Sequence, residues 1–252
     1  MYYYDWKPYV PVAARRRQAA REAAKLLKKG RRLSPVIVDG RKIAKTFWGE
    51  SWCDNLERYS DYANRLPRGR TYVRNGSVVD LQIAPGTVTA LVSGSTMYDV
   101  KVDVASVPKA RWHAISADCA GAIDSLVELL QGRFSKGVMA RLCQEKTGLF
   151  PSPQEITFTC SCPDWASMCK HVAAVLYGIG SRLDEQPDLL FALRKVNQQD
   201  LIAKASTGLS QKRKGPAGKK VLESDDLSGM FGIEIAPASR RSTGPKTKRK
   251  KR

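Results

Sequence analysis

The sequence predicts an α+β fold: an antiparallel β-meander with packed helices, then a small strand–knuckle–helix module, with a basic helix before them and a disordered basic tail after them. The first observation behind this prediction is a run of short β-branched segments between residues 70 and 104, separated by tight-turn signals. The second is the recurrence of apolar residues every three or four positions on both sides of that run, which is typical of amphipathic helices. The third is a cluster of Cys and His at residues 160–171, which marks the module.

The distribution of charge divides the chain into segments. Of its 252 residues, 43 are Lys or Arg and 24 are Asp or Glu, which gives a formal net charge of +19. Residues 1–48 hold 13 basic and 3 acidic side chains, residues 49–210 hold 17 of each, and residues 211–252 hold 13 basic and 4 acidic ones. A neutral centre between two cationic ends predicts a polyanionic partner that the ends contact.

Residues 1–46 are predicted to be a basic extension that contains one helix. The segment VPVAARRRQAAREAAKLLKKG is rich in Ala, Arg, Lys and Leu, and Gly30 suits the position after a helix C-terminus. Two interpretations stay open: a solvated helix that docks through Leu26 and Leu27, or a basic arm that lies along phosphates. In the second, the predicted nucleic-acid contacts are Arg15, Arg16, Arg17 and Arg21.

Residues 47–150 are predicted to form the α+β body. It begins with a long amphipathic helix from near Gly49 to just before Pro67, whose stripe is Trp48, Trp52, Leu56, Tyr59 and Ala63. The dipeptide Asn75-Gly76 between RTYVR and SVVDLQI then indicates a hairpin, and VTALV and YDVKVDV continue the meander. We expect these four strands to form the sheet, with the long helix covering its apolar face.

The stretch from Lys109 to Gln144 returns to helical periodicity, with GAIDSLVELLQG as its most apolar segment. His113 and Cys119 raise the hypothesis of an activated nucleophile. No Gly-rich phosphate loop, nucleophile elbow or dense carboxylate cluster accompanies them in the sequence. We therefore expect the protein not to be an enzyme, to have no catalytic residue and to take no small-molecule substrate.

Residues 151–205 are predicted to form a metal-binding module with helices after it. The segment CSCPDWASMCKH offers four ligands, Cys160, Cys162, Cys169 and His171, the number that a closed tetrahedral zinc site requires. EITFT before it reads as a strand and VAAVLYGIG after it as a helix, so that Cys169 falls at the helix start. A disulfide, a redox dithiol and an iron–sulfur site are the alternatives; one structural Zn²⁺ fits the ligand set best. The neighbouring Asp164 is read as a loop or helix N-cap, or else as the carboxylate of a nuclease site.

The pattern C-x-C-x(6)-C-x-H followed by an apolar helix resembles the SWIM zinc finger. FWGESWCDNLERYSDYANRLPRGRTYVRNGSV and GAIDSLVELLQGRFSKGV also resemble the body of bacterial SWIM zinc finger proteins, so that the likeness extends from about Phe47 to Leu201. The resemblance assigns the four ligands to zinc. It further implies a DNA-binding or protein-binding role, since this finger is found in bacterial partners of Swi/Snf-type ATPases and in plant Mutator-type transposases.

Residues 206–252 read as a disordered tail, rich in Lys, Gly, Pro and Ser. An acidic and apolar island at 223–235 within it is either a docking motif or a spacer. The tail completes the predicted nucleic-acid contacts with Lys212, Arg213, Lys214, Lys248, Arg249, Lys250, Lys251 and Arg252.

These features together predict a zinc-binding, non-enzymatic protein that binds nucleic acid, with DNA as the main partner and RNA as a second polyanion. The alternative is an adaptor for a Swi/Snf-type ATPase without specific DNA binding of its own. The chain shows neither an apolar leader nor an apolar run long enough for a membrane span, so a cytoplasmic, nucleoid-associated location and no membrane partner are expected.

Overall fold

The computed structural model describes residues 11–58, 64–121, 135–164, 166, 168–201, 203 and 204. The chain divides into two units, residues 1–211 and 212–252, and all described residues belong to the first. The segment GAIDSLVELLQG after its first residue, the first ten residues and the C-terminal tail lie outside the described residues. In chain order the elements are α1 (Val12–Lys28), α2 (Phe47–Glu57), α3 (Leu66–Arg74), β1 (Val78–Ala84), β2 (Thr87–Ser93), β3 (Met97–Val104), α4 (Lys109–Gly121), α6 (Lys136–Leu142), the 3₁₀ turn η2 (Pro153–Glu155), β4 (Ile156–Cys160), α7 (Lys170–Glu185) and α8 (Asp188–Leu193).

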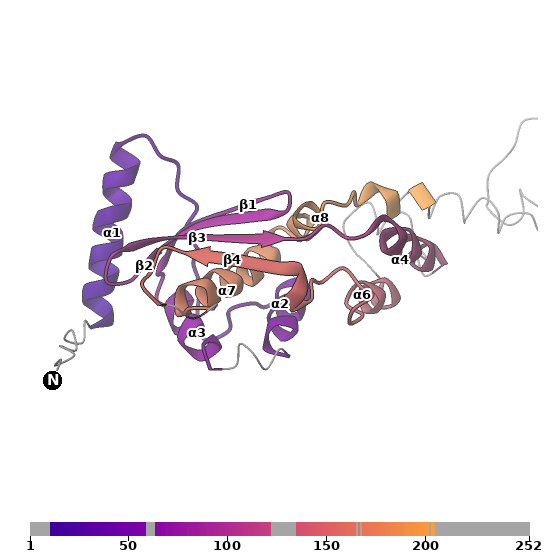
Figure 1. Ribbon diagram of the computed structural model, residues 1–252, viewed down its shortest axis with the longest axis horizontal. Coiled ribbons are helices and arrows are strands. Elements are labelled where there is room, and N and C mark those ends of the chain that lie inside the picture. Colours follow the sequence, from indigo (N-terminus) through magenta and orange to yellow (C-terminus); the bar gives the residue numbers. More distant parts are fainter. Residues whose placement is uncertain are drawn as a thin grey trace, which may run out of the picture. The chain divides into compact units, whose positions relative to one another are not determined.

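A four-stranded antiparallel sheet in the order β1-β2-β3-β4 organises the fold (Figure 1). Val88 of β2 lies opposite Val102 of β3, which in turn lies opposite Phe158 of β4. Between β1 and β2 the chain turns at Gly86, whose φ of +77° is in the left-handed region that favours glycine. The α+β class with helices packed on an antiparallel sheet is thus confirmed.

The first predicted strand, RTYVR, is wrong, because these residues are the second half of helix α3. Pro67 occupies the first turn, where a missing N–H costs nothing, and buried Leu66, Gly69 and Val73 recur at helical spacing. Gly76 therefore does not close a hairpin: with φ of +67° it ends the helix. The fourth strand of the sheet is β4, which comes from the predicted zinc module.

The predicted helix from Gly49 to Pro67 is also shorter than expected. Helix α2 ends at Glu57, and α3 begins only at Leu66, while Tyr59 and Ala63 of the predicted stripe lie outside the described residues. Trp52 confirms the buried stripe of α2, since its indole Nε1 donates a hydrogen bond of 2.8 Å to the carbonyl of Leu176 in α7.

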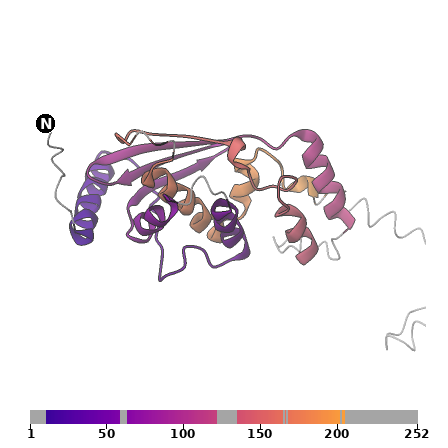
Figure 2. The same cartoon turned by 60° about the horizontal axis from the view of Figure 1, so that its bottom comes forward.

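Helix α7 is the centre of the core. All residues from His171 to Gly180 are buried, so that the helix is covered by protein all round in this part. α7 contacts β1 and β3 of the sheet as well as α2 and α3, and the three helices lie on the same side of the sheet (Figure 2). The approach is close: a Cβ on Gly69 would lie 2.5 Å from Cβ of Ala173. The segments predicted as a body and a following zinc module therefore share one sheet and one hydrophobic core.

Candidate metal centre

The four predicted ligands are delivered by the end of a strand, a knuckle and the start of a helix. Cys160 is the last residue of β4, and Ser161 extends the pairing, since its N–H donates to the carbonyl of Asp99 at 3.0 Å. Cys169 is the N-cap of α7, and its Sγ accepts a hydrogen bond of 3.5 Å from the backbone N–H of Val172. His171 follows in the first helical turn. This order of strand, knuckle and helix is the one that the spacing predicts.

The ligand atoms converge on one point. One atom from each of Cys160, Cys162, Cys169 and His171 lies within 4.8 Å of the others. The Sγ atoms of Cys160 and Cys169 are both 3.8 Å from Nδ1 of His171, which makes Nδ1 the ligating ring nitrogen. A tetrahedral zinc ion with Zn–S of about 2.3 Å and Zn–N of about 2.0 Å separates its ligand atoms by roughly 3.5 to 3.8 Å. The geometry and the Cys₃His donor set fit one structural zinc ion.

The surroundings of Cys169 favour the thiolate form of its side chain. The hydrogen bond from the Cys160 thiol, followed by those from His171 and the N–H of Val172, holds the pKa of Cys169 well below its usual value. The same bond to Cys169, together with burial, raises the pKa of Cys160. Because the thiolate is the metal-binding form, the N-terminus of α7 supplies a negative ligand at the place where the cation binds.

Aromatic rings from outside the module hold the histidine. His171 is 2% exposed; the ring of Tyr98 in β3 stacks on it with centroids 4.4 Å apart, and Tyr72 in α3 meets it edge-on at 5.4 Å. Its Nε2 is buried and has no hydrogen-bond partner among the described residues. Gly94 leaves the space for this stack, because a Cβ there would lie 2.7 Å from Tyr98 Cε2 and 2.9 Å from His171 Nε2. The sequence carries no signal for these three supporting residues, since they are distant from the ligands along the chain.

Asp164, the carboxylate next to the ligands, is used to fix the knuckle. Its Oδ1 accepts a hydrogen bond of 3.2 Å from the backbone N–H of Ala166, and its Oδ2 pairs with Nη1 of Arg65 at 3.2 Å. Both contacts are those of a side chain that caps a loop, as the loop interpretation of Asp164 expects, whereas the N-cap of the following helix is Cys169.

His113 and Cys119 lie on different sides of α4. His113 is exposed and contacts Nζ of Lys204, whereas Cys119 is fully buried. Burial is also the main cause that raises the pKa of Cys119 to about 11. The structure therefore does not join them into an activated nucleophile.

The predicted nucleic-acid contacts of the N-terminal segment are placed on α1, and those from Lys212 to Arg252 lie outside the described residues. Arg16, Arg17 and Arg21 are exposed, and Arg15 is half-buried. α1 docks through Ala19, which is 7% exposed, and through Gln18, whose amide donates to the carbonyl of Ser95 at 3.2 Å. Leu27, one of the two leucines expected to dock the helix, is instead 56% exposed.

Comparison with known proteins identifies the module. Residues 154–178 match the model of the SWIM zinc finger, as the resemblance predicts. The chain is similar to the uncharacterized protein Rv2102 of Mycobacterium tuberculosis, with 35% identity over 164 residues. The alignment covers 64% of this chain and 59% of that protein, which is less than two thirds of its length. No solved structure matches the chain. In the described part of the chain, no helix has the length and apolar character that crossing a membrane requires.

Proposed function

We propose that this chain, whose residues 154–178 are a SWIM zinc finger, is a non-enzymatic nucleic-acid-binding protein with DNA as its main partner and RNA as a second one. Its location in this proposal is the cytoplasm, at the nucleoid. The zinc ion has a structural role, since four protein ligands close the tetrahedral shell and leave no position for a substrate or an activated water.

The observation that carries this proposal is the position of the arginine-rich helix α1 beside the metal centre. Nε of Arg16 donates to the carbonyl of Asn75 at 3.1 Å, at the C-terminal end of α3, and Nη1 of Arg15 lies 3.5 Å from the hydroxyl of Tyr72. Tyr72 is the ring that meets His171 edge-on. The basic helix is thus held against the residues that hold the zinc ligand.

Two cations also lie over the ring of Tyr72. The guanidinium of Arg15 and Nζ of Lys170 lie 5.7 and 5.8 Å from the centroid of the Tyr72 ring. Arg17 and Arg21 are exposed on α1 and form no ion pair with a described carboxylate. Exposed arginines such as Arg17 and Arg21 suit the phosphates of a nucleic-acid backbone.

The proposal is tested by the binding of the full-length, zinc-loaded chain to short DNA duplexes of unrelated sequence, measured by fluorescence anisotropy. If about six to ten cations contact phosphates, the affinity falls by about 10³- to 10⁵-fold between roughly 50 and 200 mM salt, with little preference among sequences. The triple variant Arg16→Gln, Arg17→Gln, Arg21→Gln is expected to weaken binding and to lower the slope of log affinity against log salt by about three.

The matched control removes three exposed cations from other parts of the chain, in the variant Lys109→Gln, Lys136→Gln, Lys146→Gln. Its net charge is the same as that of the α1 variant. Equal weakening by both triple variants would show that net charge, and not the α1 surface, determines the affinity.

An apolar groove along α1 favours a second candidate function, that of an adaptor for a Swi/Snf-type ATPase. The groove has a volume of about 310 Å³ and is lined mainly by Ala19, Ala20, Ala23, Leu27 and Leu33. Apolar side chains that line an open groove are typical of protein interaction sites. Absence of DNA binding at low salt, combined with an ATPase that copurifies with the parent chain but not with a Leu27→Asp variant, would favour the adaptor.

A further inference from the structure

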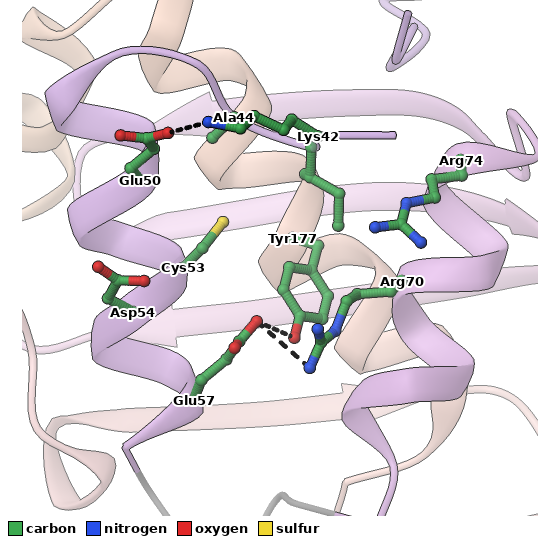
Figure 3. Close-up of a pocket in the computed structure, with 10 residues that line it drawn as sticks. Lys42, Ala44, Glu50, Cys53, Asp54, Glu57, Arg70, Arg74 and Tyr177 are labelled. Carbon is green, nitrogen blue, oxygen red and sulfur yellow. Dashed lines mark hydrogen bonds and ion pairs between the residues drawn. The ribbon is translucent and has the colours of Figure 1, made fainter. Parts of the chain in front are cut away.

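A charged pocket lies between α2 and α3, apart from the metal centre. Its volume is about 380 Å³, and it is walled by Glu50, Cys53, Asp54 and Glu57 of α2, by Arg70 and Arg74 of α3, and by the segment from Lys42 to Ala44, with Tyr177 of α7 at its base (Figure 3). Helix α3 separates the two sites: it presents Tyr72 to His171 and, from another side, Arg70 and Arg74 to the pocket.

Most of the charges that line the pocket are paired within it. Nζ of Lys42 lies 3.2 Å from Oε1 of Glu50. Oε1 of Glu57 accepts a hydrogen bond of 2.8 Å from the Tyr177 hydroxyl and lies 3.4 Å from Nη2 of Arg70. The Arg70 guanidinium also lies over the Tyr177 ring, 5.6 Å from its centroid. These contacts hold Arg70 in one orientation before any ligand binds.

Some hydrogen-bond donors of the two arginines of α3 that line the pocket have no partner among the described residues. Nε of Arg70 is buried and has no hydrogen-bond partner among the described residues, so a ligand in the pocket reaches Arg70 only through its terminal Nη atoms. Arg74, one helical turn further on, points its guanidinium into the pocket (Figure 3), and no described carboxylate pairs with it. Two guanidinium groups at this spacing repel each other weakly unless an anion lies between them. A carboxylate or phosphate satisfies such donors with charge-assisted hydrogen bonds.

The α2 wall offers acceptors instead. Asp54 and Glu50 are one helical turn apart, and the Asp54 carboxylate has no hydrogen-bond partner among the described residues. Cys53 between them is no nucleophile, because burial, followed by the charges of Glu57 and Asp54, raises the pKa of its thiol to about 12.

We infer that this pocket is a binding site for a small ligand whose phosphate or carboxylate group is held by Arg74 and Arg70 and whose hydroxyl or amino groups face Glu50 and Asp54. The volume of about 380 Å³ is near the lower end of the range for small-molecule sites, which limits the ligand to about the size of a mononucleotide. This site does not depend on the nucleic-acid function proposed for α1.

The test titrates the full-length, zinc-loaded chain with inorganic phosphate, adenosine monophosphate and succinate, followed by calorimetry and by backbone amide NMR shifts of Ala44, Cys53 and Tyr177. Binding of either phosphate probe with shifts at these amides assigns the phosphate class, and binding of succinate alone assigns the carboxylate class. Arg74→Gln should then weaken the bound probe about 10- to 100-fold, because it removes charge-assisted hydrogen bonds. The variant should fold normally, since Arg74 is exposed and its side chain forms no hydrogen bond or ion pair with another described residue.

The matched control is Arg68→Gln, which removes an exposed arginine of the same helix that does not line the pocket. Equal loss in both variants, or no saturation by any probe up to about 10 mM, would overturn the inference. The double variant Arg17→Gln, Arg21→Gln separates this site from the proposed function, because it keeps the hydrogen bond of 3.5 Å from Arg16 to the Arg74 carbonyl. It should weaken DNA binding and leave probe binding in the pocket unchanged.

Discussion

Replacement of Gly94 by Ala should weaken zinc binding although residue 94 is not a ligand. The new Cβ would lie 2.7 Å from Cε2 of Tyr98 and 2.9 Å from Nε2 of His171, whereas carbon atoms in contact normally keep about 3.5 to 4.0 Å. Neither ring can yield easily: the Tyr98 hydroxyl is hydrogen-bonded to Oγ of Ser95 at 2.6 Å, and the metal fixes His171. Overpacking of this kind costs about 1 to 3 kcal/mol. If the strain falls on the zinc-bound arrangement, the dissociation constant for zinc rises about 5- to 150-fold.

Competition with a chromophoric chelator measures this constant for the parent chain and the variant. Gly40→Ala is the matched control: Gly40 has a φ of +85°, and a Cβ added there would have no heavy atom within 4 Å, so that alanine strains the backbone without touching the site. The control should lose about 1 to 2 kcal/mol of stability and no zinc affinity. Zinc affinity of Gly94→Ala within about twofold of the parent value, a difference of roughly 0.4 kcal/mol, would refute the steric argument.

Three further predictions follow from the described contacts. The purified protein should hold one zinc per chain by elemental analysis. Cys162→Ala should lower the zinc content and speed hydrogen exchange around residues 161–169, while β1 and β2 stay protected. An unchanged zinc content would remove Cys162 from the ligand set. Burial raises the pKa of the Cys53 thiol from 9.0 to about 12, so that above pH 9 this thiol ionises in the unfolded chain but stays neutral in the folded one. The stability that Cys53 contributes is therefore fully present below pH 9 and is lost as the pH rises towards 12. Urea unfolding across this range should show the loss, and Cys53→Ala should reduce it. Trp52→Phe leaves the buried carbonyl of Leu176 without its 2.8 Å donor and should cost about 1 to 3 kcal/mol in urea unfolding, whereas a cost below about 0.5 kcal/mol would show that another donor replaces the indole.

The metal ligands could be predicted because all four lie within twelve residues and their spacing itself describes a strand, a knuckle and a helix. Residues 70–74 could not be assigned in the same way. Tyr72 and Val73 fit the alternation of a short strand as well as the buried face of a helix, and a glycine with positive φ serves both a hairpin and a helix end. The pairing of β4 with β3 joins residues more than fifty positions apart, and no local pattern encodes it. For the same reason the contacts of Tyr72, Tyr98 and Gly94 with His171 became visible only in three dimensions.

The central position of α7 limits the transfer of this zinc finger to other proteins. Residues 154–178 contain an edge strand of the sheet and a helix buried on all sides between His171 and Gly178. A graft of this segment onto another scaffold would carry its zinc ligands along but leave that helix without cover, and the donor protein would keep β3 as an open sheet edge. We therefore expect transplanted copies to aggregate, and functional chimaeras to require exchange of the whole region from α2 to α8.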